Sequence, residues 1–304
     1  MRTWRAVLAA AVAACLCSAS PAASLRSCSG SPELTPLQHD RLLQLSAWIR
    51  ADLAQQGARL ALVARSGSNL GRFDIRYSHA GLSLRDSEQG PWAVRQLYFA
   101  CDEGRPRLFD EGLTAFLAGS HEVDRGFVSV LLLPEAAALA LEAAARDRDR
   151  ALALLEGDYQ ANAHPYSLGS QNCNQWLAEL LAEAWAPATG EPAGRARSQA
   201  WLRAKGYAPR PIQLSTDLWF VAAAWVPWLS LRDHPPSDRA ALRMVTTLPE
   251  HLDTLVQQLE PQVRRIEWCH VQGRVVRREG WGRPLDEACT AEAGDQRFDA
   301  HAGE

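Results

Sequence analysis

The sequence predicts an α+β fold in which an antiparallel sheet packs against helices. Residues 36–56 carry leucine and isoleucine at roughly helical spacing, behind a threonine and a proline that favour a helix start. Residues 73–85 alternate between apolar and polar side chains, and residues 92–100 are rich in aromatic and branched side chains, which favours two strands. The polar turn at 86–91 between them predicts an antiparallel hairpin.

The remaining segments continue this mixture of strands and helices. Further strands are expected at 59–65 and 126–133, and a second hairpin at 263–278. Helices are expected at 111–117, 134–155, 173–185, 195–205 and 250–259. Because residues 186–194 are rich in proline, glycine and alanine, we predict a main domain at 24–190 and a C-terminal extension of helices and a hairpin at 191–304, packed on it. From Thr290 on, the chain is polar and is expected to be mobile.

The first residues have the features of an export signal. Two arginines provide a positive start, residues 6–16 form a short apolar run, and residues 18–24 are mostly small side chains suited to cleavage. We therefore expect a signal peptide at 1–23 and an exported, periplasmic protein. A lipoprotein is the alternative, because the Val-Ala-Ala-Cys run ending at Cys15 resembles a lipobox whose cysteine is acylated.

Composition argues against two classes of interaction. The formal net charge of -3 gives no reason to expect nucleic-acid binding, because a phosphate backbone requires a basic face. After the signal, no segment reaches about eighteen uncharged apolar residues. No transmembrane segment is therefore predicted in the mature chain.

Export changes the expected state of the cysteines. Of the seven cysteines, Cys15 and Cys17 leave with the signal. The five that remain are Cys28, Cys101, Cys173, Cys269 and Cys289. An odd number in an oxidising compartment leaves one thiol unpaired. Several pairings are possible; the local choice joins Cys269 to Cys289, which leaves Cys28 with Cys101 and Cys173 free. No Cys-x-x-Cys or His-x-x-x-His spacing occurs, so neither a metal site nor a cofactor is expected.

A cysteine and a histidine are the strongest candidates for chemistry. Cys173 starts a predicted helix, where unpaired N–H groups and the helix dipole favour a thiolate and can bind an oxyanion. His79 lies in the middle of a predicted strand, which can hold its imidazole rigidly as a general base and acid. The two residues together predict a thiol–imidazole pair.

Such a pair needs a third group to orient the imidazole. Strand alternation and a turn centred near Ser87 and Glu88 place His79 opposite about residue 96. Gln96 is therefore the candidate orienting residue. Tyr98 and the asparagines beside Cys173 are the alternatives.

These motifs resemble a known superfamily. The strand motif Tyr-Ser-His-Ala-Gly at 77–81, followed by Asn-Cys-Asn-Gln-Trp at 172–176, resembles the circularly permuted branch of the NlpC-type, papain-like cysteine hydrolases. Across the mature chain, including 280–286, the sequence is similar to an uncharacterised bacterial family of exported proteins known only as a domain of unknown function (2145). The superfamily resemblance covers about 60–185 and implies a permuted papain-like fold. It also implies cleavage or formation of amide and thioester bonds, often in peptidoglycan peptides or lipids. One departure is Gln96, where those enzymes often carry a histidine or an acid.

The sequence therefore supports a periplasmic cysteine hydrolase or acyltransferase acting on an amide or ester bond of a peptide, cell-wall or lipid substrate. In the alternative, Cys173 is a small buried hydrophobe and His79 a hydrogen-bonded core residue. The protein is then a catalytically inactive cell-envelope binding protein with the same fold. A redox or assembly factor acting through disulfides is a third hypothesis, but no paired-cysteine motif supports it.

Overall fold

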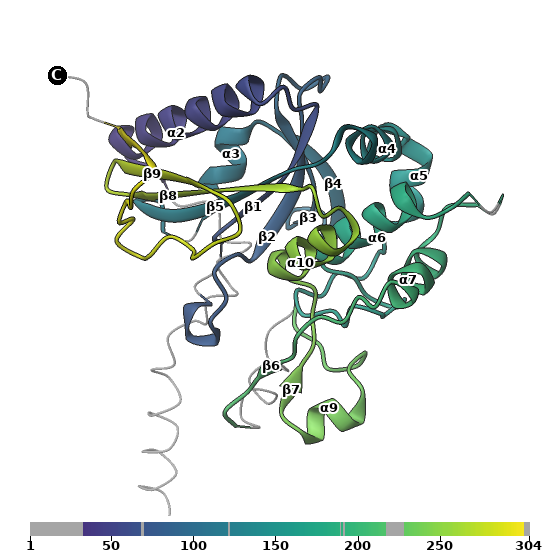
Figure 1. Ribbon diagram of the computed structural model, residues 1–304. Helices are drawn as coiled ribbons and strands as arrows, with labels where there is room; N and C mark the ends of the chain where they lie inside the picture. The colour runs from purple at the N-terminus through teal and green to yellow at the C-terminus, as the bar shows by residue number, and fades with distance from the viewer. Residues whose placement is uncertain are drawn as a thin grey trace, which may run out of the picture. The chain divides into compact units, whose positions relative to one another are not determined.

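A computed structural model describes residues 33–67, 70–120, 122–188, 190, 192–216 and 228–300. The expected signal peptide at 1–23, together with Cys15 and Cys28, lies outside these residues. Within them the chain has the predicted α+β class, with a large antiparallel sheet and helices against both of its faces (Figure 1).

Each predicted helix and strand has a counterpart in the structure. The strands are β1 (Leu60–Arg65), β2 (His79–Leu84), β3 (Ala93–Ala100), β4 (Arg105–Glu111), β5 (Arg125–Leu132), β6 (Ile212–Gln213), β7 (Arg243–Met244), β8 (Arg264–Val271), β9 (Arg274–Glu279) and β10 (Gln296–Asp299). The helices are α2 (Pro36–Gln55), α3 (Leu113–Ala118), α4 (Glu135–Arg146), α5 (Arg148–Ala153), α6 (Cys173–Trp185), α7 (Arg195–Ala204), α9 (Pro236–Ala240) and α10 (Pro249–Leu259), with a 3-10 turn η2 (Gly71–Phe73) before β2.

One sheet joins segments from both ends of the chain. Its strand order is β10-β9-β8-β5-β1-β2-β3-β4, and each neighbouring pair is antiparallel. The predicted C-terminal hairpin is β8–β9, and β8 pairs with β5 over its whole length. These strands therefore extend the central sheet itself, whereas the sequence predicted an extension packed on the main domain.

Two apolar cores lie on the two faces of the sheet, and β1 contributes to both. Leu60, Leu62 and Ala64 pack with α4, α6 and α10, whereas Ala61 and Val63 pack with α2 and α3. This division follows from the alternation of side chains along a strand. Because all of β1 is buried, its sequence is apolar up to Arg65.

Three local features differ from the sequence-based expectation. The predicted helix at 134–155 is interrupted at Asp147, whose side chain caps α5 by accepting a hydrogen bond from the Arg150 N–H. The helix expected to begin at Glu111 begins after Gly112 instead, and Glu111 ends β4, an edge strand whose polar sequence gave no strand signal. The tail expected to be mobile contains β10, which pairs with β9.

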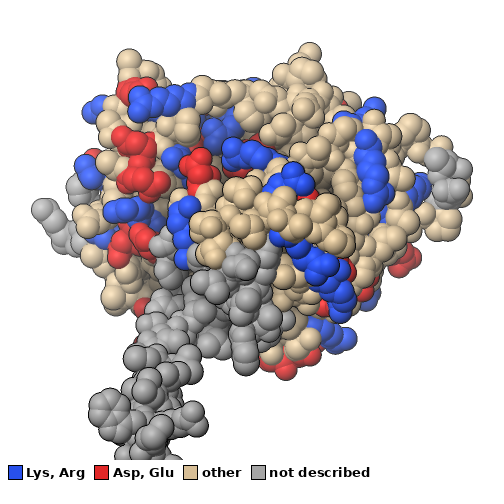
Figure 2. Space-filling view, turned by 90° about the horizontal axis from the view of Figure 1, so that it is seen from below, with Lys and Arg blue, Asp and Glu red and all other residues tan. Residues whose placement is uncertain are grey.

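The surface gives no sign of a single-charge patch on the face shown in Figure 2. Basic and acidic side chains of the described residues are interspersed there, in keeping with the formal net charge of -3. Among the described residues, no helix is long and apolar enough to cross a bilayer.

The cysteines of the described residues divide into bonded and free. Cys269 of β8 is bonded to Cys289, with a Cα–Cα distance of 5.5 Å and 20 residues between them in sequence. Closing a loop of this length stabilises a fold by about 3 kcal/mol in the chain-entropy account. Cys101 is also in a disulfide, and Cys173 is a buried free cysteine. Disulfides are compatible with an exported protein.

Thiol labelling checks this assignment. In denaturant without reductant, iodoacetamide is expected to alkylate Cys173 and to leave Cys101, Cys269 and Cys289 unlabelled, because bonded sulfurs are not nucleophiles. Peptide mass mapping provides the measurement, and labelling after reduction is the control. Labelling of Cys269 or Cys289 without reductant would contradict the pairing.

Candidate functional site

Cys173 is the first residue of α6, as the sequence predicts. The Asn172 side chain caps the helix by accepting a hydrogen bond of 2.7 Å from the Gln175 N–H. Burial leaves Cys173 only 6% exposed. The cysteine therefore lies where helix N–H groups are available, but below the protein surface.

His79 is the first residue of β2, whereas the sequence predicted a position in the middle of a strand. The chain before it turns through η2, and Asp74 adopts a left-handed conformation with φ of 59°. The expected strand at 73–85 is therefore shortened at its start. His79 is 7% exposed, and its ring centroid lies 5.8 Å from that of Phe116 in α3.

The Asn174 side chain connects the start of α6 to the start of β2. Its Oδ1 accepts a hydrogen bond of 3.0 Å from the Ala80 N–H, and its Nδ2 donates to the Ser78 carbonyl at 3.1 Å. These two backbone groups flank His79. The amide of Asn174 thus holds the segments that carry Cys173 and His79 side by side.

The two side chains belong to different layers of the fold. Cys173 is part of the core on the α6 face of the sheet. His79 is paired in register with Arg65 of β1, and its ring packs towards α3 on the other face. The β2–β3 pairing ends at Leu82 and Arg95, and beyond it Asn174 binds the backbone of β2. Among the described residues the imidazole bonds to Gln96 and the thiol to Tyr159, and no hydrogen bond joins the thiol to the imidazole.

Gln96 contacts His79, although by a different register from the one expected. The predicted turn placed His79 opposite residue 96, whereas the observed Leu82–Arg95 and Ser83–Val94 pairs place Gln96 opposite Gly81 when continued along the strands. A shift of two residues keeps every side chain on its face of the sheet. Because Gly81 has no side chain, Gln96 can reach diagonally to His79, and its Oε1 hydrogen-bonds to His79 Nε2.

Glu111 determines the orientation of this hydrogen bond. The Gln96 Nε2 donates to Glu111 Oε1, and an ionised carboxylate can only accept. The amide oxygen of Gln96 must then face His79, so His79 Nε2 carries the hydrogen and donates it. The lone pair is left on Nδ1, for which the described residues provide no hydrogen bond. Glu111 therefore selects, through Gln96, the tautomer of His79 that carries its hydrogen on Nε2.

Burial keeps both groups of the candidate pair neutral. Burial, with the positive charge of Arg65 as a second cause, lowers the pKa of His79 to about 3, although the hydrogen bond that His79 donates to Gln96 acts in the opposite direction. Burial also raises the pKa of the Cys173 thiol to about 11, although the Asn174 N–H, the Tyr159 hydroxyl and Arg65 act in the opposite direction. At neutral pH the site therefore holds a thiol and an imidazole and not a thiolate–imidazolium pair.

Sequence reasoning missed three residues of this site. The phenol of Tyr159 hydrogen-bonds to Cys173, and the Tyr159 backbone forms a bridge with Gln171 just before α6. Glu111 and Arg65 come from strands whose pairing brings them to His79. None of the three had a motif of its own; a correct prediction of β4 would have pointed to Glu111.

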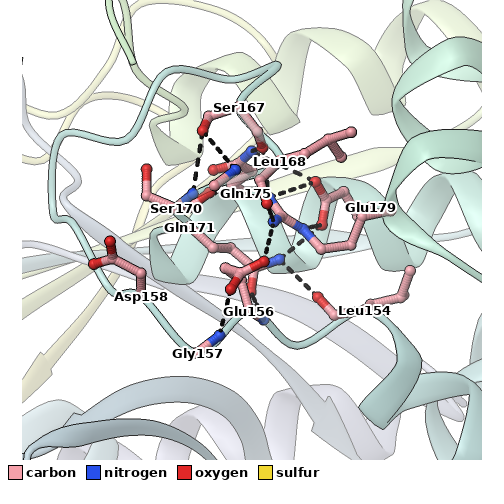
Figure 3. A network of polar contacts seen from close by, with 12 residues as sticks. Leu154, Glu156, Gly157, Asp158, Ser167, Leu168, Ser170, Gln171, Gln175 and Glu179 are labelled. Carbon is pink, nitrogen blue, oxygen red and sulfur yellow. Dashed lines mark hydrogen bonds and ion pairs between the residues drawn. The ribbon is translucent and has the colours of Figure 1, made fainter. Parts of the chain in front are cut away.

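A buried polar network fixes the loop that leads into Cys173 (Figure 3). Glu179 of α6 is fully buried, and Arg195 of α7 binds it at 2.9 Å. Arg195 also donates to the Ser167 and Ser170 carbonyls at 2.7 and 3.0 Å. Gln171 donates to Glu179 Oε2 at 2.7 Å (Figure 3). The segment preceding Cys173 is thus tied to two helices.

A separate cavity of about 350 Å³ lies beside α10 and contains none of the predicted site residues. Its lining includes Tyr207, Arg210 and His251. Among the described residues, no group of three or more His, Cys, Asp or Glu side chains is placed to hold a metal ion.

Comparison with known proteins identifies a family but no activity. A family model described as "Uncharacterized protein conserved in bacteria (DUF2145)" matches residues 52–256, about two thirds of the chain. The chain belongs to this family. Neither a curated protein nor a solved structure matches the sequence. The matched range contains His79, Gln96 and Cys173, so the candidate site is part of the family's own domain.

Breaking the Glu179–Arg195 pair is expected to destabilise the protein strongly. Arg195→Met leaves a buried carboxylate without its cation, which typically costs about 3–5 kcal/mol. Urea denaturation gives the change in the free energy of unfolding. Arg210→Met is the control, because its ion pair with Glu250 is exposed and contributes about 1 kcal/mol at most. Equal effects of the two substitutions would contradict a structural role for the buried pair.

The lowered pKa of His79 predicts that acid destabilises the fold. Between about pH 6.5 and 3 the unfolded chain binds a proton at this residue and the native chain does not. The contribution is therefore complete above pH 6.5 and decreases, by up to about 1.4 kcal/mol per pH unit, as the pH falls towards 3. His79→Gln is expected to flatten this part of the stability profile. An unchanged profile would show that His79 titrates normally.

Proposed function

We propose that this chain is an exported cysteine hydrolase or acyltransferase of the permuted papain-like kind. Cys173 is the nucleophile, His79 the general base and acid, and Gln96 the residue that orients His79. The bond attacked is an amide or ester of a peptidoglycan peptide or a lipid. The resemblance to NlpC-type hydrolases supports the substrate class, and the expected signal peptide supports a periplasmic location.

The observation that carries the proposal is the hydrogen-bond chain from Glu111 through Gln96 to His79. It directs the protonated Nε2 of His79 at Gln96 and leaves Nδ1 as a hydrogen-bond acceptor. Asn174 adds the second requirement by holding the cysteine segment against the backbone on both sides of His79.

In the proposed reaction the thiol proton passes to Nδ1 of His79 while the sulfur attacks the carbonyl carbon of the substrate. The C–S bond forms and the carbonyl oxygen becomes an oxyanion. The imidazolium then gives its proton to the leaving nitrogen or oxygen while the oxyanion collapses and the bond between that atom and the carbonyl carbon breaks, so the acyl group remains on Cys173. Water or another acceptor, deprotonated by His79, attacks the acyl carbon; the C–S bond breaks, and the proton on His79 returns to the sulfur.

The first turn of α6 supports the oxyanion in this scheme. Asn172 already accepts the Gln175 N–H, whereas the N–H groups of Cys173 and Asn174 are directed at the sulfur. Donors in this position can bind an oxygen that develops next to the sulfur. Because the resting thiol is neutral, the thiolate forms only as attack begins.

A catalytically inactive binding protein is the second candidate. It is favoured by the burial of Cys173, which is 6% exposed, and by the raised pKa of its thiol. In that case the polar chain from Glu111 to His79 serves only to satisfy buried groups. The two proposals differ in whether Cys173 reacts in the folded protein.

Acylation by an activated ester tests the enzyme proposal. With p-nitrophenyl acetate at neutral pH, the folded protein is expected to release p-nitrophenolate and to acquire an acetyl group on Cys173, detected by peptide mass spectrometry. His79→Ala is expected to slow acylation about 10²- to 10⁴-fold, because it removes the general base. Gln96→Leu is expected to have a smaller effect, since it releases the tautomer but keeps the base.

His270→Gln is the matched control. His270 is also buried with its pKa lowered to about 4, but it lies on β8 outside the candidate site. This variant is expected to acylate at the wild-type rate. If Cys173 remains free of acetyl groups, or if His79→Ala reacts as fast as wild type, the enzyme proposal fails and the binding protein is favoured.

A further inference from the structure

Arg65 places a buried positive charge beside the candidate catalytic pair. It is the last residue of β1, 5% exposed, and its register partner across the sheet is His79. Residues paired in this way lie on the same face of a sheet. The charge of Arg65 acts on His79 and on Cys173, lowering the pKa of each.

The guanidinium is held by backbone and by an aromatic ring. Its Nη1 donates to the carbonyl oxygens of Gly119, at 2.6 Å, and Ser66, at 3.4 Å. The Phe116 ring centroid lies 5.3 Å from its Cζ. A Cβ atom on Gly119 would lie closest to Nη2 and 2.8 Å from Cζ, so the guanidinium packs directly against the Gly119 backbone.

No carboxylate of the described residues bonds directly to this guanidinium, although the charge of Glu111 acts on it through space. Arg65 forms no ion pair with a described Asp or Glu, and its buried Nε has no hydrogen-bond partner. The nearby Glu111 hydrogen-bonds to Gln96 instead. The Nη2 of Arg65 likewise donates to none of the described residues. A buried charge without a hydrogen-bonded counterion is unfavourable, because its desolvation is only partly compensated.

The hydrogen bonds of Nη1 account for only some of the donors of the Arg65 guanidinium. They tie the end of β1 to the residue that follows α3, which is a structural role. The Nε–Nη2 edge remains, and this edge matches the two oxygens of a carboxylate. Tyr98, whose ring lies 5.8 Å from that of His79, is 39% exposed, so the site is about one side chain below the surface.

We propose that the Nε–Nη2 edge of Arg65 binds a carboxylate of the ligand, next to the carbonyl group that Cys173 attacks. This inference rests on the proposed function and specifies its substrate class. The substrate is an acyl compound, such as a peptide, with a free carboxylate beside the bond that is cleaved. Binding of that carboxylate supplies the hydrogen-bonded counterion that the described residues do not provide.

A pair of alkylating reagents tests this without a known substrate. Iodoacetate carries a carboxylate and iodoacetamide does not, while both form the same C–S bond with Cys173 and release iodide. We expect the rate with iodoacetate divided by the rate with iodoacetamide to be larger at Cys173 than at the thiol of glutathione. The expected difference is about tenfold or more, the equivalent of one charge-assisted hydrogen bond. Effects on thiolate formation cancel in this ratio.

Variants of Arg65 identify the cation responsible. Arg65→Met is expected to lower the ratio to the glutathione value, and Arg65→Lys to retain part of the preference. Arg148→Met, at an exposed arginine of α5, is the control and should keep the wild-type ratio. A ratio in Arg65→Met equal to that of wild type overturns the carboxylate site. Loss of thermal stability in that variant with no change in ratio would leave Arg65 a structural residue only.

A binding measurement decides the case in which Cys173 does not react. Acetate, titrated against chloride at equal ionic strength, is expected to shift the Arg65 ¹⁵Nε resonance of the wild-type protein, assigned by its loss in Arg65→Lys. No shift up to high acetate concentration overturns the inference. Failure of the enzyme proposal is seen separately, as an unreactive Cys173 or an unaffected His79→Ala, whereas an acetate shift with an unreactive thiol indicates a carboxylate-binding protein.

Discussion

The side-chain amide of Asn174 is the contact on which the candidate site depends. It is 2% exposed and makes three hydrogen bonds, with the Ala80 N–H, the Ser78 carbonyl and the Thr247 carbonyl. The first turn of α6 is thereby fixed to β2 and to the segment before α10. Removing one buried partner would leave the others unsatisfied, at about 1–3 kcal/mol each. An apolar residue of similar size could fill the space but could not set the position of Cys173.

Charge in this site is arranged around a single cation. Arg65 favours a thiolate at Cys173 and disfavours an imidazolium at His79, so it assists one half of the proposed proton transfer and opposes the other. Burial disfavours both charged forms, so Cys173 and His79 are both neutral in the resting site. On the proposed function, a carboxylate ligand bound to Arg65 would offset its effect on His79. The histidine would then become a better base only when substrate is present.

The polar network behind Cys173 explains how so many buried charges are tolerated. Arg195 and Glu179 satisfy each other, and glutamines from α6, α7 and the preceding loop occupy the remaining carboxylate positions. A fully satisfied network makes a region rigid, whereas a partly satisfied one is destabilising. Arg65 differs from Arg195, since its buried Nε has no hydrogen-bond partner among the described residues. The contrast between Arg195 and Arg65 is the reason to connect the first with structure and the second with a ligand.

By itself, the sequence determined those features whose causes are local. The α6 start at Cys173 follows from its capping residues, and the contact of Gln96 with His79 was predictable because strand parity is preserved even when the register is wrong by two. Glu111, Tyr159 and Arg65 could not be placed in this way. Their positions depend on the pairing of β4 with β3, on the loop before α6 and on the pairing of β1 with β2, all of which are contacts between distant segments. The burial that keeps Cys173 and His79 neutral is likewise a property of the assembled layers, because only the packed structure determines how much water reaches a side chain.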